Sequence, residues 1–338
     1  MSFYPSSNTP TRSIETETSY LNTFRQLRNR CAREHGYGTA EADNVTPEVL
    51  CIWLLGRVHE FSKSTWHQYK AATLFSIQKN YSEYTEVISQ LQFQKSSELP
   101  AMSKRTSGRK LKCVPPEFWE NFRSVLQIRA RKHRYSMTLL NFLHATIITG
   151  LRPNEWFNSI ISRHTKTGKL VLKVKNSKNS NWRANGGFRE IFISELLHDD
   201  LEAIKITIAY CSAQQKNIKS SLTSLQNEFF NARKQLCEEK AITNCKVAMY
   251  SFRHQFFANI KKIRMQGPCI AALGGHNSVH TSTKHYGKKH SGNLGPSVMP
   301  TPESIDAVCN HGAGRRNVAI STEISPTTEN ASGNKPEI

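Results

Sequence analysis

A polar, basic stretch divides this sequence into two regions. Residues 94–112 (QKSSELPAMSKRTSGRKLK) contain the breakers Pro100 and Gly108, and apolar residues recur at regular spacing only before and after them. A stretch of this composition predicts a linker rather than a helix or strand. We therefore expect two domains, which fits the rough prior of one domain per about 100–200 residues for a chain of 338 residues.

The positive charge of the chain is concentrated in one segment. The sequence has 46 Lys and Arg against 26 Asp and Glu, for a net charge of +20, and residues 101–290 hold 33 of the basic and 11 of the acidic residues. Residues 1–100 are balanced, with ten of each. This density favours a surface that binds a polyanion, nucleic acid above all, over the alternative of a solvated basic face without a partner.

Several classes of protein are disfavoured. No apolar run approaches the roughly 20 residues of a membrane span, and the first 13 residues (MSFYPSSNTPTRS) lack a hydrophobic signal segment. The eight cysteines are never closer than eight positions apart, which excludes a CxxC pair. We expect reduced cysteines in a cytoplasmic protein that does not contact membranes.

The first region predicts a helical domain over residues 14–96, after a flexible arm over residues 1–13. Apolar residues recur at helical spacing from residue 20, and further helices are expected to begin near residues 46, 65 and 84. Thr65 and Gln68 are expected to form the capping box of the third helix.

The second region predicts a mainly α (α+β) domain over residues 113–290, with residues 97–112 as the linker. Helices are expected at 116–131, 137–149, 195–214, 221–239 and 251–264, and strands at Leu170–Val174 and Glu190–Ser194. The two strands would form a long hairpin with a polar tip. The segment 291–338 is rich in Ser, Thr, Pro, Asn and Gly, and we expect it to be disordered.

The first motif with chemical content follows the second of these helices. In Thr149-Gly150-Leu151-Arg152 the helix ends at glycine, and the next turn holds an arginine whose guanidinium can bind two phosphate oxygens. Glu155 is expected to be a buried partner that orients Arg152. The alternative is an ordinary helix end with a surface arginine.

Two further motifs lie near the end of the second region. In Tyr250-Ser251-Phe252-Arg253, Ser251 is expected to cap a helix and to place Arg253 in its first turn, where the helix dipole favours an anion. Leu273-Gly274-Gly275-His276 follows, and Tyr286 stands ten residues after His276, within Thr283-Lys284-His285-Tyr286-Gly287. His254 is expected to point away from Arg253 and to be structural.

These motifs, with a hairpin between the first and the second, resemble in kind and order the signature of the tyrosine recombinases, the phage-integrase type of DNA strand-exchange enzyme. The resemblance covers residues 101–290, and residues 14–96 are similar to the family's helical (SAM-like) core-binding domain. It implies a mostly α-helical catalytic domain with a small antiparallel sheet.

The resemblance also implies roles for individual residues. Tyr286 would attack the scissile phosphate and form a 3′-phosphotyrosyl link, while Arg152, Arg253 and His276 would contact the phosphoryl group. A lysine of the hairpin would be the general acid, and Lys178 at the start of the turn is favoured over Lys175. Tyr250 stands where the family usually has histidine, and a phenol with an ordinary pKa near 10 is a poor base at pH 7.

The expected partner is double-stranded DNA at the half-sites of an attachment site. By resemblance, four protomers would assemble on two synapsed duplexes during integration or excision of a mobile element, with a possible accessory directionality factor. Such a protein would be associated with the nucleoid. No cofactor and no metal are expected, since Cys269 and the histidines that follow it match no common zinc spacing. The basic residues expected to contact DNA are Arg25, Arg28, Lys63, Lys104, Arg105, Arg109, Lys110, Lys175 and Arg183.

Two other functions compete with this one. A type IB topoisomerase uses a similar set of arginine, lysine, histidine and tyrosine to relax DNA. A DNA-binding protein that has lost catalysis is conceivable because of Tyr250, although Tyr286 together with both arginines favours an enzyme.

Overall fold

The structure, a computed structural model, describes residues 13–38, 44–81, 83–94, 110–177, 184, 186–240, 245–281, 286–293 and 298–312. The buried side chains form two large hydrophobic clusters, one between residues 24 and 91 and one between residues 114 and 298. Residues 1–12 of the expected arm and residues 97–109 of the expected linker lie outside the described ranges, as do residues 95 and 96. No helix in these ranges is long and apolar enough to cross a membrane.

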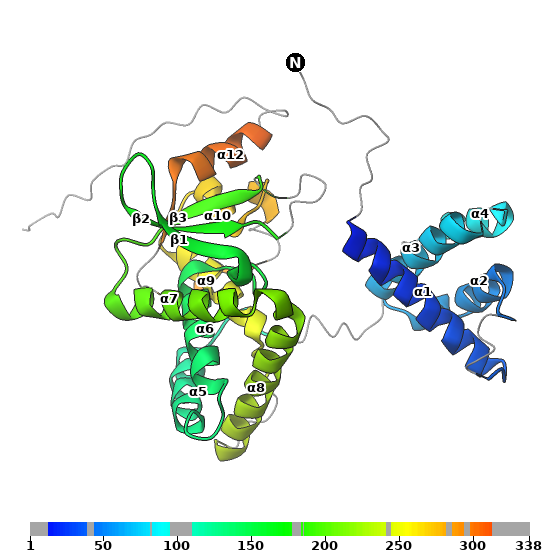
Figure 1. Ribbon diagram of the computed structural model, residues 1–338, viewed down its shortest axis with the longest axis horizontal. Helices are drawn as coiled ribbons and strands as arrows, with labels where there is room; N and C mark the ends of the chain where they lie inside the picture. The colour runs from blue at the N-terminus through cyan, green and yellow to red at the C-terminus, as the bar shows by residue number, and fades with distance from the viewer. Residues whose placement is uncertain are drawn as a thin grey trace, which may run out of the picture.

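The first cluster is built from helices alone (Figure 1). The elements are α1 (Ile14–Glu34), α2 (Pro47–Gly56), the 3₁₀ turn η2 (Val58–Glu60), α3 (Lys63–Asn80) and α4 (Thr85–Phe93). Leu50, Leu54 and Trp66 are fully buried among them. The expected cap at Thr65 is wrong: Ser62 caps α3, and its Oγ accepts a hydrogen bond of 3.2 Å from the Thr65 amide. Serine is a favourable N-cap residue, so α3 begins at Lys63, about one turn before Trp66, the first residue of its apolar stripe.

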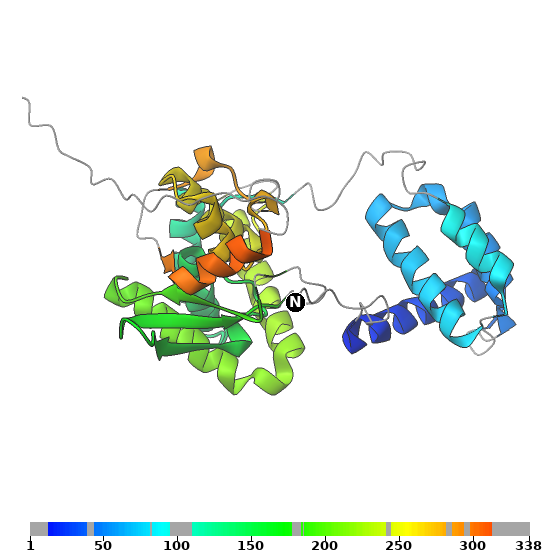
Figure 2. The same ribbon diagram turned by 90° about the horizontal axis from the view of Figure 1, so that it is seen from above.

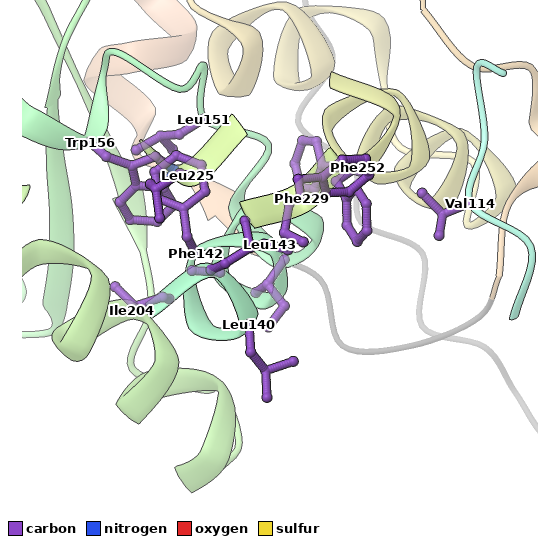
Figure 3. Packing of buried hydrophobic residues seen from close by; sticks show 14 of the residues in the cluster. Val114, Leu140, Phe142, Leu143, Leu151, Trp156, Ile204, Leu225, Phe229 and Phe252 are labelled. Atoms are coloured by element: carbon purple, nitrogen blue, oxygen red, sulfur yellow. The ribbon is translucent and has the colours of Figure 1, made fainter. Parts of the chain in front are cut away.

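The second cluster includes the buried side chains of α6, and Figure 3 shows part of its apolar side chains. Its helical elements are α5 (Pro116–Arg129), α6 (Ser136–Thr149), η5 (Trp156–Asn158), α7 (His198–Ala213), η7 (Gln215–Asn217), α8 (Ile218–Glu239), α9 (Met249–Lys262), α10 (Gly267–Gly274) and η8 (Lys289–Ser291). Phe142 of α6 is 1 % exposed and packs against Trp156, with ring centroids 6.2 Å apart. A helix as apolar as α6 has to be covered on most sides, and α5, α7, α8 and α9 cover it.

A four-stranded antiparallel sheet lies against these helices (Figure 2). Its strands are β1 (Ser159–Arg163), β2 (Leu170–Lys175), β3 (Phe188–Phe192) and β4 (Met299–Pro300), in this order across the sheet. Leu172 faces Ile191 across the β2–β3 pair, and both are fully buried. One more inward position of β3 is Arg189, a charged residue in an otherwise apolar face. The expected hairpin is present, β1 was not expected, and the expected fold class, mainly α with a small antiparallel sheet, is confirmed.

The expectation of disorder from residue 291 onward is wrong for residues 298–312. They form β4 and the helix α12 (Pro302–Gly312), which lie beside β3 and α10. The Thr301 amide donates to the Glu190 carbonyl at 3.0 Å, and Val308 packs against Ala271 and Ala272 of α10. These few contacts hold the segment in place although its overall composition is polar. Composition alone does not reveal such contacts, and it therefore predicted disorder. Residues 313–338 lie outside the described ranges.

Candidate active site

The turn that carries Arg152 follows directly from the end of α6. Gly150 ends this helix with φ at +68°, and a Cβ atom there would overlap the ring of Phe256, so that only glycine fits. Arg152 is 6 % exposed and therefore not a surface arginine. Its Nη1 donates to Oε1 of Glu155 at 2.6 Å, and its amide donates to Oε2 at 2.8 Å. The expected role of Glu155 as a buried partner of Arg152 is confirmed.

Arg253 lies in the second turn of α9, not in the first. The helix begins at Met249, and the side chain of Ser251 accepts from the Ala248 amide at 3.0 Å and donates to the Leu111 carbonyl at 2.6 Å. Ser251 is therefore the third residue of the helix, and the expected cap at this position is wrong. Arg253 is fully buried, and backbone carbonyls hold it: Nη1 donates to Gly150 and Nη2 donates to Gly274 at 3.0 Å.

His276 is held by the glycine turn at the end of α10. Gly275 has φ at +63°, and a Cβ atom on Gly274 would lie 2.6 Å from the imidazole ring. Burial lowers the pKa of His276 to about 2, and the positive charges of Arg253 and Arg152 act in the same direction. The imidazole is therefore neutral at pH 7. Its Nδ1 is buried and has no hydrogen-bond partner among the described residues.

Three side chains meet at the hydroxyl of Tyr286. Nη2 and Nε of Arg253 donate to it at 3.2 and 3.4 Å, Nε2 of His276 lies 3.4 Å away, and the hydroxyl of Tyr250 lies 3.3 Å away. Tyr286 is 9 % exposed, and burial alone would raise its pKa. The charges of Arg253 and Arg152 and the hydrogen bond with Tyr250 outweigh burial, so that the pKa of Tyr286 is below its ordinary value.

Tyr250 shifts in the opposite direction. Burial raises the pKa of Tyr250, and the neighbouring Tyr286 raises it further against the lowering effect of Arg253. Of the two phenols, Tyr286 therefore loses its proton first, and Tyr250 remains the donor in their hydrogen bond. Tyr250 is also the more exposed of the pair, at 37 %.

Positive charge is in excess around these groups. Glu155 is 1 % exposed, and among the described residues it is the one carboxylate paired with the guanidinium groups of Arg152, Arg189 and Arg253. Burial would raise the pKa of Glu155, but the three arginines hold it well below its usual range. Nε of Arg152 is buried and has no hydrogen-bond partner among the described residues. One negative and three positive charges, with a free donor, suit an anion such as a phosphodiester.

One residue of this cluster, Arg189, was not predicted from the sequence, and a second, His254, lies closer to the tyrosines than its predicted structural role required. Arg189 gave no signal, since a single arginine in an amphipathic strand is normally solvated. His254 was expected to point away from Arg253 and to be structural, and its ring lies 5.2 Å from the rings of both Tyr250 and Tyr286. Burial lowers the pKa of His254 to about 4, and the nearby Lys112, Arg253 and Lys261 contribute. His254 is therefore neutral at pH 7, and its ring packs against the rings of both tyrosines.

The structure places only some of the residues that the sequence analysis assigned to DNA. Arg25 on α1, Lys110 before α5 and Lys175 at the end of β2 are exposed, and Arg28 and Lys63 are partly buried. The four others, Lys104, Arg105, Arg109 and Arg183, lie outside the described residues, and so does Lys178, the expected general acid. All of these roles stay predictions. Within the described ranges, no group of three or more His, Cys, Asp or Glu side chains is arranged to hold a metal ion.

Comparisons with known proteins relate this architecture to solved structures. No family model matches the chain, and no curated protein matches it in sequence. The chain is similar to a lambda integrase (75–356) dimer bound to a COC′ core site, with 15 % identity, coverage of 82 % of this chain and 89 % of that one, and a TM-score of 0.42. It is also similar to the Tn1549 transposon integrase in complex with transposon right end DNA. The identity there is 14 %, the match covers 79 % of this chain and 96 % of that one, and the TM-score is 0.41. A third similar structure is the XerH site-specific recombinase bound to a palindromic difH substrate. The identity is 15 %, the match covers 84 % of this chain and 88 % of that one, and the TM-score is 0.40. At this identity the likeness concerns the fold alone, and the fold is similar to those of integrases and site-specific recombinases.

Proposed function

We propose that this chain is a site-specific DNA recombinase that cleaves and rejoins DNA through Tyr286. The observation that carries the proposal is the convergence of Arg253, His276 and Tyr250 on the hydroxyl of Tyr286, beside a buried cluster with excess positive charge. A phenol whose pKa is lowered by arginines is an activated nucleophile, and guanidinium groups stabilise the charge that develops on a phosphoryl group.

The reaction conserves the number of phosphodiester bonds. Tyr286 gives up its phenol proton to solvent and its oxygen attacks the phosphorus, so that a phosphotyrosyl bond forms at the 3′ side and the bond to the 5′ oxygen breaks. The leaving 5′ oxygen takes up a proton and departs as a hydroxyl. The 5′ hydroxyl of a second strand then attacks the phosphotyrosyl bond, which restores the DNA and returns a proton to Tyr286.

Arg152 and Arg253 would bind the non-bridging oxygens of the phosphate. His276, neutral at pH 7, would add one hydrogen bond, and Tyr250 would donate to the attacking oxygen. We assign the general acid to Lys178. Ser177, the residue directly before it, supports this choice, because its Oγ lies 3.2 Å from Oε1 of Glu155 and so ties the start of the hairpin tip to the arginine cluster.

The proposal extends to the partners that the motifs imply. The substrate would be a pair of DNA duplexes carrying half-sites, held by four protomers, and the biological role would be integration or excision of a mobile element. The exposed basic residues Arg25, Lys110 and Lys175 would contribute sequence-independent affinity for the phosphate backbone.

A nicked suicide substrate, made from DNA that flanks the gene, tests the proposal. The wild-type protein should form a denaturation-resistant adduct with the DNA. Tyr286→Phe should form none while it still shifts the same DNA in a gel, and Tyr210→Phe, a tyrosine of α7 outside the site, should form the adduct normally. Absence of a wild-type adduct, or an adduct with Tyr286→Phe, would contradict the assignment. Relaxation of supercoiled plasmid without an attachment site would point to a topoisomerase instead.

A further inference from the structure

Arg189 contacts three separate segments of the candidate active site. We propose that Arg189 is a positioning residue, whose guanidinium fixes the Arg152 turn, the base of the β2–β3 hairpin and the His276 turn relative to one another. The side chain is 1 % exposed, and nothing in the reaction requires it to touch the DNA. This inference rests on the proposed function, since it concerns the same site.

The first contact reaches the turn of Arg152. Nη2 of Arg189 donates to Oε2 of Glu155 at 2.8 Å, and the same oxygen accepts from the Arg152 amide at 2.8 Å. The other carboxylate oxygen binds Nη1 of Arg152. Glu155 is thus held from one side by Arg189, and it holds Arg152 from the other. The direction of the Arg152 guanidinium therefore depends on Arg189.

The second contact reaches the hairpin. Nη1 of Arg189 donates to Oδ1 of Asn176, the residue after β2. Asn176 also closes the base of the hairpin, because its amide donates to the Gly187 carbonyl at 2.9 Å and its Nδ2 donates to the Gly186 carbonyl at 2.8 Å. The base of the loop that carries the proposed general acid is thereby tied to Arg189.

The third contact reaches the turn of His276. Nε of Arg189 donates to the Leu273 carbonyl at 3.0 Å. The packing of the next residues supports this contact independently: a Cβ atom on Gly275 would lie 2.7 Å from Oδ1 of Asn176 and 2.8 Å from Nη1 of Arg189. The backbone of the Gly-Gly turn therefore lies directly on the guanidinium group.

Only arginine among the side chains can make these contacts together. Its guanidinium presents donors in three directions within one plane, whereas a lysine ammonium is a single point. In Arg189 each of the three nitrogens has a different acceptor, and these acceptors are 21 or more positions apart in the sequence. A lysine at this position would keep the charge and lose the geometry.

Arg189→Lys is the informative variant, and Arg129→Lys is its matched control. Arg129 also forms an arginine–glutamate pair, partly buried, with 2.8 and 3.1 Å to the two oxygens of Glu228, but it links α5 to α8 away from Tyr286. In single-turnover cleavage of the suicide substrate, Arg189→Lys should be about 10- to 100-fold slower than wild type, as is typical when a residue behind the reacting groups is lost. Arg129→Lys should stay within about twofold, and the Kd for DNA should change little in either variant. Wild-type cleavage by Arg189→Lys would overturn the proposal.

A substrate with an uncharged methylphosphonate at the scissile position separates positioning from general damage. If Arg189 acts by aligning Arg152 with the phosphate charge, Arg189→Lys should slow cleavage of the natural substrate more than cleavage of the methylphosphonate substrate. The factor by which the rate falls, relative to wild type, should be at least tenfold smaller for the methylphosphonate substrate. An equal penalty on both substrates would overturn the proposal. Should Arg189→Lys fail to fold, Asn176→Ala, which removes one of the three contacts, should show the same pattern with a smaller loss.

Hydrogen exchange keeps this test apart from that of the proposed function. If wild type forms no adduct, the function is wrong, and the inference is judged on the free protein. Amide exchange at Ser177 and His276 should accelerate together in Arg189→Lys and not in Arg129→Lys. Unchanged exchange at both residues would show that Arg189 does not hold these segments.

Discussion

The hydroxyl of Tyr250 lies 3.3 Å from the hydroxyl of Tyr286, and the pKa values of the two phenols shift in opposite directions. Burial raises the pKa of Tyr250, while the arginines lower that of Tyr286. In the proposed reaction, two side chains of the same chemical type would therefore divide the roles of donor and nucleophile. A phenol at position 250 would suit that reaction, because it would serve as a donor and not as a base.

Tyr250→Phe should slow cleavage by about tenfold at pH 7. Loss of one hydrogen bond to a charged oxygen costs about 1.5 kcal/mol, which corresponds to roughly one order of magnitude in rate. Without this donor the pKa of Tyr286 rises, so that the increase of rate with pH moves to higher pH and the difference from wild type narrows there. A pH–rate profile of adduct formation measures both effects. Tyr250→His keeps a hydrogen-bond donor, and its cleavage rate should lie between those of wild type and Tyr250→Phe. Identical pH–rate profiles for wild type and Tyr250→Phe would contradict this role of Tyr250.

His276 should make the stability of the protein depend on pH. Its pKa is about 2 in the folded protein and near 6.5 in the unfolded chain, so below pH 6.5 the unfolded chain binds a proton that the folded protein does not. The free energy of unfolding should therefore fall by about 1.4 kcal/mol per pH unit below pH 6.5 through this residue alone. Urea unfolding at pH 7, 6 and 5 should show this slope as a difference between wild type and His276→Gln. Parallel curves for the two proteins would show that His276 is protonated in the fold.

Glu155→Gln should lower the free energy of unfolding by about 3–5 kcal/mol, because it removes the carboxylate that pairs with buried arginines. Glu228→Gln should lower it less, because Arg129 is only partly buried and also donates to Gln235. Only the Glu155 variant leaves three neighbouring guanidinium groups, those of Arg152, Arg189 and Arg253, without their shared carboxylate. Sulfate should therefore restore the Tm of Glu155→Gln more than that of Glu228→Gln, when compared with chloride at equal ionic strength. Equal responses to sulfate would mean that the arginine cluster does not bind anions.

Gly150→Ala should cost more stability than Gly168→Ala. Both glycines have φ near +68°, which costs about 1 kcal/mol for alanine, but a Cβ atom meets nothing within 4 Å at Gly168 and overlaps the ring of Phe256 at Gly150. Displacement of that ring should add about 1–3 kcal/mol. Chemical unfolding of the two variants gives the comparison. Cleavage should fall only in Gly150→Ala, because the Gly150 carbonyl holds Arg253.

Local patterns in the sequence predicted most of the helices and the hairpin, because apolar spacing and glycine turns act over a few residues. They also singled out Arg152, Arg253, His276 and Tyr286, since each lies beside a glycine turn or a helix start with recognisable chemistry. They failed at Arg189, whose burial depends on Glu155 and on the Leu273 carbonyl, 34 and 84 positions away. They failed again at Ser251, where the contact with the distant Leu111 carbonyl, and not the local capping preference, decides the role of the hydroxyl.

The distance along the chain between the parts of the arginine cluster has a consequence for synthesis. Ribosomes add about 5–20 residues per second, so Tyr286 follows Arg152 by roughly 7 to 27 s. During this interval the ribosome adds α9, then α10 and last Tyr286 to a chain that already contains Arg152. The reactive phenol gains its lowered pKa only when these late segments close over the early ones. Under the proposed function, a chain whose synthesis has not yet reached Tyr286 cannot cut DNA, so translation itself delays cleavage until the site is complete.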